Sequence, residues 1–197
     1  MILSRRHFLV SAAAAAAAVP LLGEDSSAGE LAPIFASESQ EVPYRFRRRE
    51  VDFETAEVPG TIVVDTKMRY LYHVLGNGRA TRYGVGVGDD GKEWTGRAEV
   101  RRKREWPVWR PTDEHIAKYP KLAKWHKDGM PGGRDNPMGA RALYLYQGDV
   151  DTLYRIHGTN KPKGIGRRVT SGCLRMLNID VVHLYERVEI GTLVVVA

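Results

Sequence analysis

One cysteine and one histidine stand together in a Gly-rich, basic stretch, HGTNKPKGIGRRVTSGCLRM, residues 157 to 176. Cys173 is the only cysteine of the 197 residues, so no internal disulfide can form. A free thiol is only slightly ionised at neutral pH, and a nearby imidazolium would lower its pKa. His157 could take the thiol proton and later return it to a leaving amine, while the amides of Gly172 and Cys173 bind an oxyanion. The stretch therefore indicates nucleophilic acyl transfer.

Two further interpretations of this stretch stay open on the residues alone. A lone cysteine is often a small buried hydrophobe without chemistry. The second interpretation is a metal site formed by His157, Cys173 and a further histidine. No close ligand pair such as Cys-x-x-Cys is present, so we predict no metal and no cofactor. The remaining internal histidines are predicted to be surface or structural residues: His73, His115, His126 and His183.

The elements around the pair are short and mostly extended. TLYRIH (152–157) reads as a strand that delivers His157 at its end. NIDVVHLYERVE (178–189) reads as a helix with Asn178 as N-cap and Asp180 in its first turn. GTLVVV reads as a last strand.

The upstream half carries more strand signals. RYLYHVL (69–75) and RATRYGVGVG flank a Gly-Asn-Gly turn and predict a hairpin, and the GVGVGDDG spacing does not fit a nucleotide loop. Residues 98–111 read as extended, 113–128 as a helix broken at Pro120, and ARALYLY as a strand after a long Gly- and Pro-rich loop. Many short strands with few helices predict a mainly β sandwich or barrel-like domain.

Charge and the first residues bear on partners and location. The formal charge is +6, which favours anionic partners, although neither aromatic interleaving nor a helical period supports nucleic acid. MILSRRHFLVSAAAAAAAVPLLG resembles a twin-arginine export signal. We predict a signal over 1–28, a linker over 29–57 and one domain over 58–197, in a protein that is exported to the periplasm or cell wall and is monomeric.

The stretch also carries a family resemblance. It is similar to the signature of the L,D-transpeptidase catalytic domain, or YkuD domain: His-Gly-Thr, a loop, then Ser-x-Gly-Cys-x-Arg-Met. Thr170 stands at the Ser position, and Ser171 fills the variable one. NPMGARALYL and TIVVDTKMRYLYHV resemble further parts of the family, so that the resemblance covers roughly residues 58 to 197 and implies a YkuD-like β-sandwich with a few short helices.

The resemblance implies a role for each matching residue. Cys173 would be the nucleophile and His157 the base and acid, oriented by the carbonyl of Gly158. Gly172 and Cys173 would supply oxyanion amides. Arg175 would hold substrate or, equally, brace the loop. Ser171 would contact substrate, and Tyr144 and Trp109 would line the cleft or belong to the core.

The implied reaction takes place on peptidoglycan stem peptides. Cys173 would attack the third residue of a stem tetrapeptide, release D-Ala and leave a thioester. An amine of a second stem would give a 3-3 cross-link, a lipoprotein lysine would give anchoring, and water would give an L,D-carboxypeptidase. The residues are also compatible with a different cysteine hydrolase of wall peptides and with a non-catalytic wall-binding protein.

Overall fold

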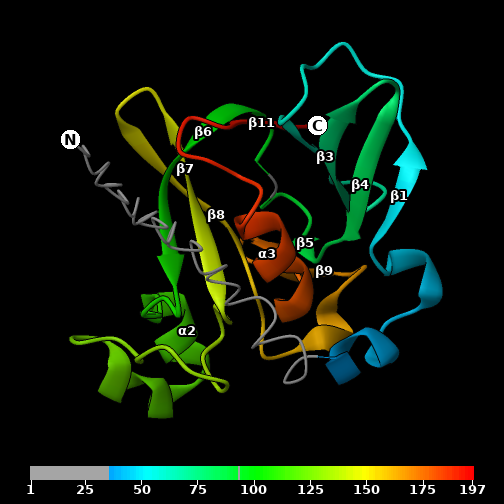
Figure 1. The fold of residues 1–197 in the computed structure, drawn as a ribbon. Coiled ribbons are helices and arrows are strands. Elements are labelled where there is room, and N and C mark those ends of the chain that lie inside the picture. The colour runs from blue at the N-terminus through cyan, green and yellow to red at the C-terminus, as the bar shows by residue number, and fades with distance from the viewer. Residues whose placement is uncertain (1–35, 93) are drawn as a thin grey trace, which may run out of the picture.

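The protein folds around one long, strongly bent β-sheet (Figure 1). The structure is a computed structural model that describes residues 36–92 and 94–197. The predicted signal over 1–28 lies outside the described residues. Within these ranges no helix has the length and apolar content needed to cross a bilayer.

Eleven strands are found in the described ranges. Nine form one hydrogen-bonded ladder, in the order β1-β4-β3-β2-β11-β6-β7-β8-β10, and β5 and β9 form a small second sheet. Their bounds are β1 Arg49–Asp52, β2 Ile62–Asp65, β3 Tyr70–Gly76, β4 Arg79–Gly84, β5 Val87–Gly88, β6 Gly96–Glu105, β7 Arg141–Gln147, β8 Val150–His157, β9 Arg168–Thr170, β10 Leu174–Arg175 and β11 Leu193–Val196.

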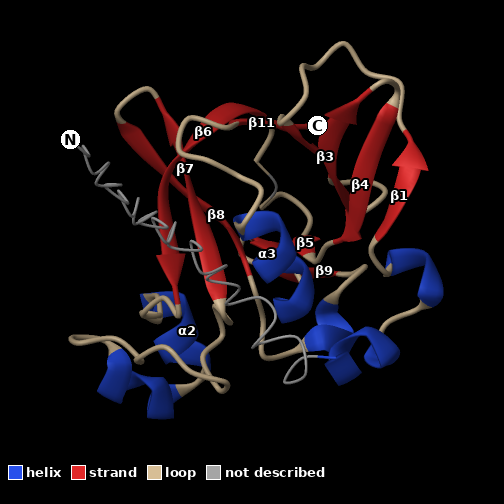
Figure 2. Cartoon of the chain, in the orientation of Figure 1, coloured by secondary structure: helices blue, strands red, loops and turns tan. Residues whose placement is uncertain are grey.

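The helices are few and short (Figure 2). They are α2 Asp113–Lys118, α3 Asn178–Tyr185 and the 3₁₀ helices η1 Ala36–Glu41, η2 Tyr44–Phe46, η3 Pro120–Trp125 and η4 Pro162–Gly164. The break between α2 and η3 falls at Pro120, as predicted, because proline has no N–H to continue the helix.

The main core lies between the two ends of the bent sheet. One cluster of buried side chains joins Leu71 and Tyr83 of the hairpin to Leu145 and Ile156 of β7 and β8, with Leu184 of α3 among them. Figure 1 shows α3 between the β3–β4 side and the β7–β8 side. The prediction of a mainly β fold with few helices is confirmed, and the two faces of the core come from one continuous ladder that bends.

The segment predicted as a linker is structured from residue 36 onward. β1 pairs with β4, and Phe46 and Val42 are buried against Tyr70 and Ile165. The Ser- and Glu-rich composition of this segment favours a linker, but its few apolar residues are placed where they cover the core.

The start of α3 differs from the sequence prediction. Leu177, not Asn178, is the N-cap residue, and the carboxylate of Glu38 accepts the Asn178 N–H at 2.7 Å. The Asn178 side chain is occupied elsewhere, as described below. Asp180 is buried and paired with Arg48 at 3.3 Å, and burial raises its pKa to about 7.

Candidate active site

His157 is the last residue of β8 and is buried. Its Nδ1 lies 2.6 Å from the Gly158 carbonyl oxygen. Because a carbonyl can only accept, Nδ1 carries the proton and Nε2 is left as the basic nitrogen. Burial and the positive charge of Arg175 lower the pKa of His157 to about 4, outweighing the carbonyls of Gly158 and Met138. The imidazole is therefore a neutral base at neutral pH.

The loop after His157 is held by Asn178, a residue that the sequence analysis placed only at a helix cap. Its Oδ1 accepts the Ala140 N–H at 2.8 Å, and its Nδ2 donates to the Thr159 carbonyl at 2.7 Å and to Glu38 at 2.7 Å. A Cβ at Gly158 would come within 2.3 Å of Asn178 Oδ1. Only glycine therefore fits where the carbonyl that orients His157 is held.

Cys173 lies in the loop between β9 and β10 and is partly buried. The Thr170 hydroxyl donates to the Cys173 carbonyl at 2.7 Å and accepts the Gly172 N–H at 3.1 Å. This use of Gly172 differs from the prediction that its amide binds an oxyanion, since the N–H already has a partner. Within the part of the chain that the structure describes, the Cys173 amide has no hydrogen-bond partner, so it is the amide that remains for an oxyanion.

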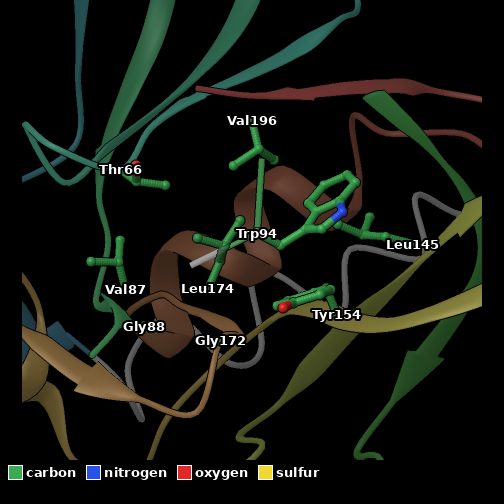
Figure 3. A pocket seen from close by; sticks show the side chains of 9 residues that line it. All are labelled: Thr66, Val87, Gly88, Trp94, Leu145, Tyr154, Gly172, Leu174 and Val196. Carbon is green, nitrogen blue, oxygen red and sulfur yellow. The ribbon is translucent and has the colours of Figure 1, made fainter. Parts of the chain in front are cut away.

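Gly172 is needed for close packing as well. Its φ is +127°, and a Cβ there would meet the Tyr154 ring at 2.5 Å. Behind it lies a cavity of about 10 Å³, lined by Trp94, Tyr154 and Leu174 among others (Figure 3). This space has room for at most one water and none for a substrate.

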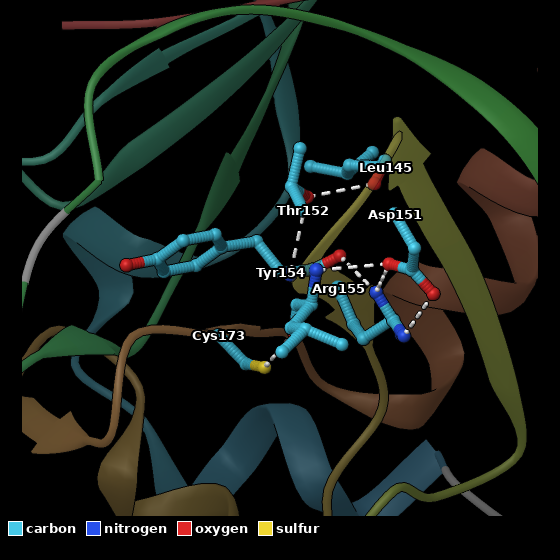
Figure 4. Close-up of polar contacts among 7 residues, drawn as sticks. Leu145, Asp151, Thr152, Tyr154, Arg155 and Cys173 are labelled. Carbon is cyan, nitrogen blue, oxygen red and sulfur yellow. Dashed lines mark hydrogen bonds and ion pairs between the residues drawn. The ribbon is translucent and has the colours of Figure 1, made fainter. Parts of the chain in front are cut away.

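The thiol of Cys173 lies against the edge of β8 (Figure 4). Its Sγ is 3.9 Å from the Leu153 carbonyl oxygen, a weak contact. Burial raises the pKa of the thiol, and the amide and guanidinium of Arg155 and the charge of Arg175 oppose this only in part. The prediction that His157 lowers the thiol pKa is thus wrong for the resting site, because the neutral imidazole contributes no charge. Burial therefore favours the neutral form of both the thiol and the imidazole.

One open cleft of about 1160 Å³ brings the predicted residues together. His157, Cys173, Ser171 and Arg175 all line it. Arg175 lines the cleft, and its buried Nε has no hydrogen-bond partner among the described residues. Within the same ranges, no group of three His, Cys, Asp or Glu side chains could hold a metal ion.

The two aromatic residues predicted to line the cleft lie in different places. Trp109 lines the cleft. Tyr144 does not line it: its ring packs between two guanidiniums, 4.9 Å from that of Arg102 and 4.4 Å from that of Arg155. Tyr154, for which no role was predicted, lines the cleft instead, and its ring packs beside Gly172 and against Trp94.

The far wall of the cleft was also missed. It is built by α2, η3 and the following loop, and includes Tyr119, Lys121, Lys124 and Trp125. The helix signal of this segment was recognised, but nothing in the sequence says that it faces Cys173. An apolar and aromatic wall carrying lysines could bind an extended, partly anionic ligand.

The structure places Cys173 and His157 in one cleft of a mainly β domain, and these are the residue types that a cysteine acyl-transfer reaction requires. Residues 59–196 match the YkuD family, the L,D-transpeptidase catalytic domain. The chain therefore belongs to this family.

Individual relatives agree on the family. The "Probable L,D-transpeptidase ErfK/SrfK" of Salmonella typhimurium is 38% identical over 137 residues, which are 68% of this chain and 42% of that protein. The chain thus spans under half the length of this relative. The "Putative L,D-transpeptidase in ATP synthase subunits region ORF 5" of Fuscovulum blasticum is 32% identical over 93% of this chain and 90% of that protein.

Solved structures give the same fold. A Brucella melitensis protein titled a probable carnitine operon oxidoreductase caia is 47% identical, with a TM-score of 0.54 over 79% of this chain and 95% of that one. The L,D-transpeptidase of Mycobacterium smegmatis has a TM-score of 0.51 at 15% identity, over 70% of this chain and 58% of that one. At this identity the second likeness supports the fold alone.

Proposed function

We propose that this protein is a peptidoglycan L,D-transpeptidase with Cys173 as nucleophile. The observation that carries the proposal is the arrangement of the cleft, where Cys173, Arg175 and a His157 oriented by Gly158 share one wall. Family membership supports the same reaction class. The substrate is the stem tetrapeptide, and the charge of Arg175 matches its carboxylates.

The reaction follows from the neutral state of both groups. Cys173 Sγ attacks the carbonyl carbon of the third stem residue while His157 Nε2 takes the thiol proton. The Cys173 amide stabilises the oxyanion. The C–N bond then breaks, the amine of D-Ala leaves with the proton from His157, and a thioester remains. An acceptor amine attacks the thioester and gives a proton to His157. The C–S bond breaks, an amide forms, and His157 returns the proton to the Cys173 sulfur.

The size of the cleft leaves room for an amine acceptor beside the donor. At about 1160 Å³ it exceeds the usual range for a site that holds one small ligand. Donor and acceptor stems can therefore be bound together. A second stem gives a 3-3 cross-link, and a lipoprotein lysine gives wall attachment, with the same chemistry.

We also propose that the protein acts outside the cytoplasm as a monomer, in the periplasm or at the cell wall. The supporting observations are the Arg5–Arg6 signal over 1–28 and a substrate class found in the wall. Replacing both arginines by lysine should retain the protein in the cytoplasm, as fractionation and immunoblotting would show. Normal export of this variant would exclude the twin-arginine route.

The decisive experiment is product analysis with purified protein and disaccharide-tetrapeptide. Cross-linked dimers with one D-Ala released per dimer are expected. Free D-Ala without dimers would identify an L,D-carboxypeptidase. No product, together with no mass adduct from a carbapenem, would exclude the proposal. Cys173→Ala must abolish both signals.

A further inference from the structure

β8 contains a large irregularity directly beside Cys173. Tyr144 and Tyr146 of β7 pair with Arg155 and Asp151 of β8, so Leu145 alone faces the three residues 152–154. Leu153, in the middle, has φ +63°, which is unfavourable for a residue with a Cβ. Its side chain is 75% exposed, so core packing does not force this conformation. Something else must hold the bulge in place.

Two side chains of the bulge, those of Asp151 and Thr152, form hydrogen bonds with its backbone and with β7 (Figure 4). Asp151 Oδ1 accepts the Leu153 N–H at 2.8 Å. The Thr152 hydroxyl donates to the Leu145 carbonyl at 2.7 Å and accepts the Tyr154 N–H at 3.2 Å. These bonds replace the ladder that the bulge interrupts.

The strongest contact is the pair of Asp151 and Arg155. Two hydrogen bonds, of 2.7 and 2.9 Å, join the carboxylate to the guanidinium, which also donates to the Tyr154 carbonyl. Four residues of a regular strand would span about 13 Å, so this bidentate contact favours the shortened path through Leu153. Only 14% of the Arg155 side chain is exposed, and the Tyr144 ring packs against its guanidinium.

The bulge presents two backbone groups to the thiol. The Leu153 carbonyl accepts from Cys173 Sγ, and the Arg155 amide donates to the sulfur in its thiolate form. A regular strand would point these groups elsewhere. The charges that act on the thiol are those of Arg155 and Arg175. The charged or titratable side chains that line the same cleft are His157, Arg110, Asp113, Glu114, His115, Tyr119, Lys121, Lys124, Asp135, Tyr154, Lys161 and Arg175.

We propose that Asp151 is a positioning residue, which fixes the bulge through Leu153 N–H and Arg155 and thereby sets the Leu153 carbonyl and Arg155 amide against Cys173 Sγ. This inference deepens the proposed function and rests on it for its kinetic part. It also gives Tyr144 a role outside the cleft, since its ring supports Arg155. Asp151 itself is absent from the cleft wall and touches no reacting atom.

The test compares Asp151→Ala with Asp151→Asn. Both variants lose the carboxylate charge, but only asparagine keeps an oxygen that accepts the Leu153 N–H. The first readout is the midpoint of iodoacetamide alkylation against pH, which needs no peptidoglycan activity. We expect a higher midpoint in the alanine variant than in the asparagine variant, because the thiolate loses its amide donor. Asp149→Ala, an exposed change in the same hairpin, should match the wild type.

The second readout is the split between kcat and KM on the tetrapeptide. The alanine variant should lose about ten- to a hundred-fold in kcat relative to asparagine, with KM little changed, as expected for a misplaced nucleophile. If Asp151→Ala does not fold, Thr152→Val against Thr152→Ser tests the other bond of the bulge with the same expected order.

The outcomes separate this inference from the proposed function. Alkylation midpoints in the alanine and asparagine variants that both equal the wild-type midpoint overturn the positioning role of Asp151, even if the wild type cross-links stems. A clear difference in midpoint supports that role even if no cross-linking is found, in which case only the proposed function fails.

Discussion

His157 and Cys173 share one cleft wall but are held by different kinds of contact. His157 ends a strand of the main sheet, and its loop is fixed by Asn178, which reaches Glu38 140 positions away in the sequence. Cys173 lies in a loop between two short strands, and its carbonyl is held by a hydroxyl three residues earlier. The loop of the base is therefore held by long-range tertiary contacts, whereas the backbone of the loop that carries the nucleophile is held by local ones.

This difference fits what each group does. A general base works in one ring orientation, and burial keeps that ring fixed and neutral. The nucleophile must reach a substrate carbonyl, so it stays partly exposed. Long-range contacts should therefore couple the base to the stability of the whole domain, whereas the local contacts of Cys173 should affect chemistry first. Four experiments test this difference between the two residues.

The largest effect is expected for His157→Gln. Removal of the base should lower the rate of acylation of Cys173 by about 10²–10⁴-fold, with the domain still folded because glutamine fills a similar polar volume. The rate can be followed by intact-protein mass spectrometry with a carbapenem, with circular dichroism to check the fold. A loss below about ten-fold would mean that His157 is not the base.

Asn178→Ala should affect stability and activity together. It leaves the Ala140 N–H and the Thr159 carbonyl without their partner and removes one of two hydrogen bonds that the Glu38 carboxylate accepts from residue 178, at a cost of about 3 kcal/mol in total. The melting temperature should fall by roughly 6–12 °C. Thermal unfolding and acylation rates would be measured side by side. A normal melting temperature with normal acylation would contradict a long-range anchor for the base.

The buried imidazole should also make stability depend on pH. The pKa of His157 is about 4 in the folded protein against 6.5 as the ordinary value. Between pH 6.5 and 4 the unfolded chain binds a proton on this histidine and the folded protein does not. The contribution of the neutral imidazole to the free energy of unfolding is therefore complete above pH 6.5 and is lost as the pH falls toward 4. Linkage gives at most about 3 kcal/mol for the whole window.

The measurement is the difference in unfolding free energy between wild type and His157→Gln, by urea denaturation from pH 7 to 4. The opposite contribution of Asp180, whose pKa is raised to about 7, occurs in both proteins and cancels. The wild type should lose more stability than the variant across the window. Parallel curves would show that His157 is not buried in a neutral state.

The smallest stability effect is expected for Thr170→Val. Valine keeps the shape of this buried residue but removes the hydroxyl between the Cys173 carbonyl and the Gly172 N–H, at about 1–3 kcal/mol. The rate of acylation should fall by more than the lower stability alone would cause, because the loop that loses these hydrogen bonds carries Cys173. Thr170→Ser keeps the hydroxyl and should restore the rate. Equal rates in both variants would remove the case for a local anchor.

The difference between local and long-range contacts also explains which features could be predicted from the sequence. The hairpin, β7, β8 and β11 were readable because β-branched residues and turn residues follow one another locally. Cys173, His157 and Gly158 could be named because their motif is short and contiguous. Asn178 and Glu38 could not be paired, because nothing local signals a contact across 140 positions.

Two further features escaped prediction for other physical reasons. The low pKa of His157 depends on burial and on Arg175, and burial at a strand end is not encoded in neighbouring letters. The bulge in β8 looks like an ordinary strand in TLYRIH, since Leu153 gives no sign of a left-handed backbone. Its polar partners, Asp151 and Thr152, are the signal that could have suggested it.

β11 has a consequence for how the chain is made. This strand lies between β2 and β6, in parallel register with Ile62–Val64 and antiparallel to Gly96–Glu99. On the ribosome, the hairpin and β7–β8 emerge first but remain two separate pieces of sheet, because the strand that joins them is synthesised later than both. The domain can therefore close only after residues 193–196 have left the ribosome. Until then, β2 and β6 expose open edges, and a nascent chain stalled before this point would depend on chaperones to avoid pairing with other chains.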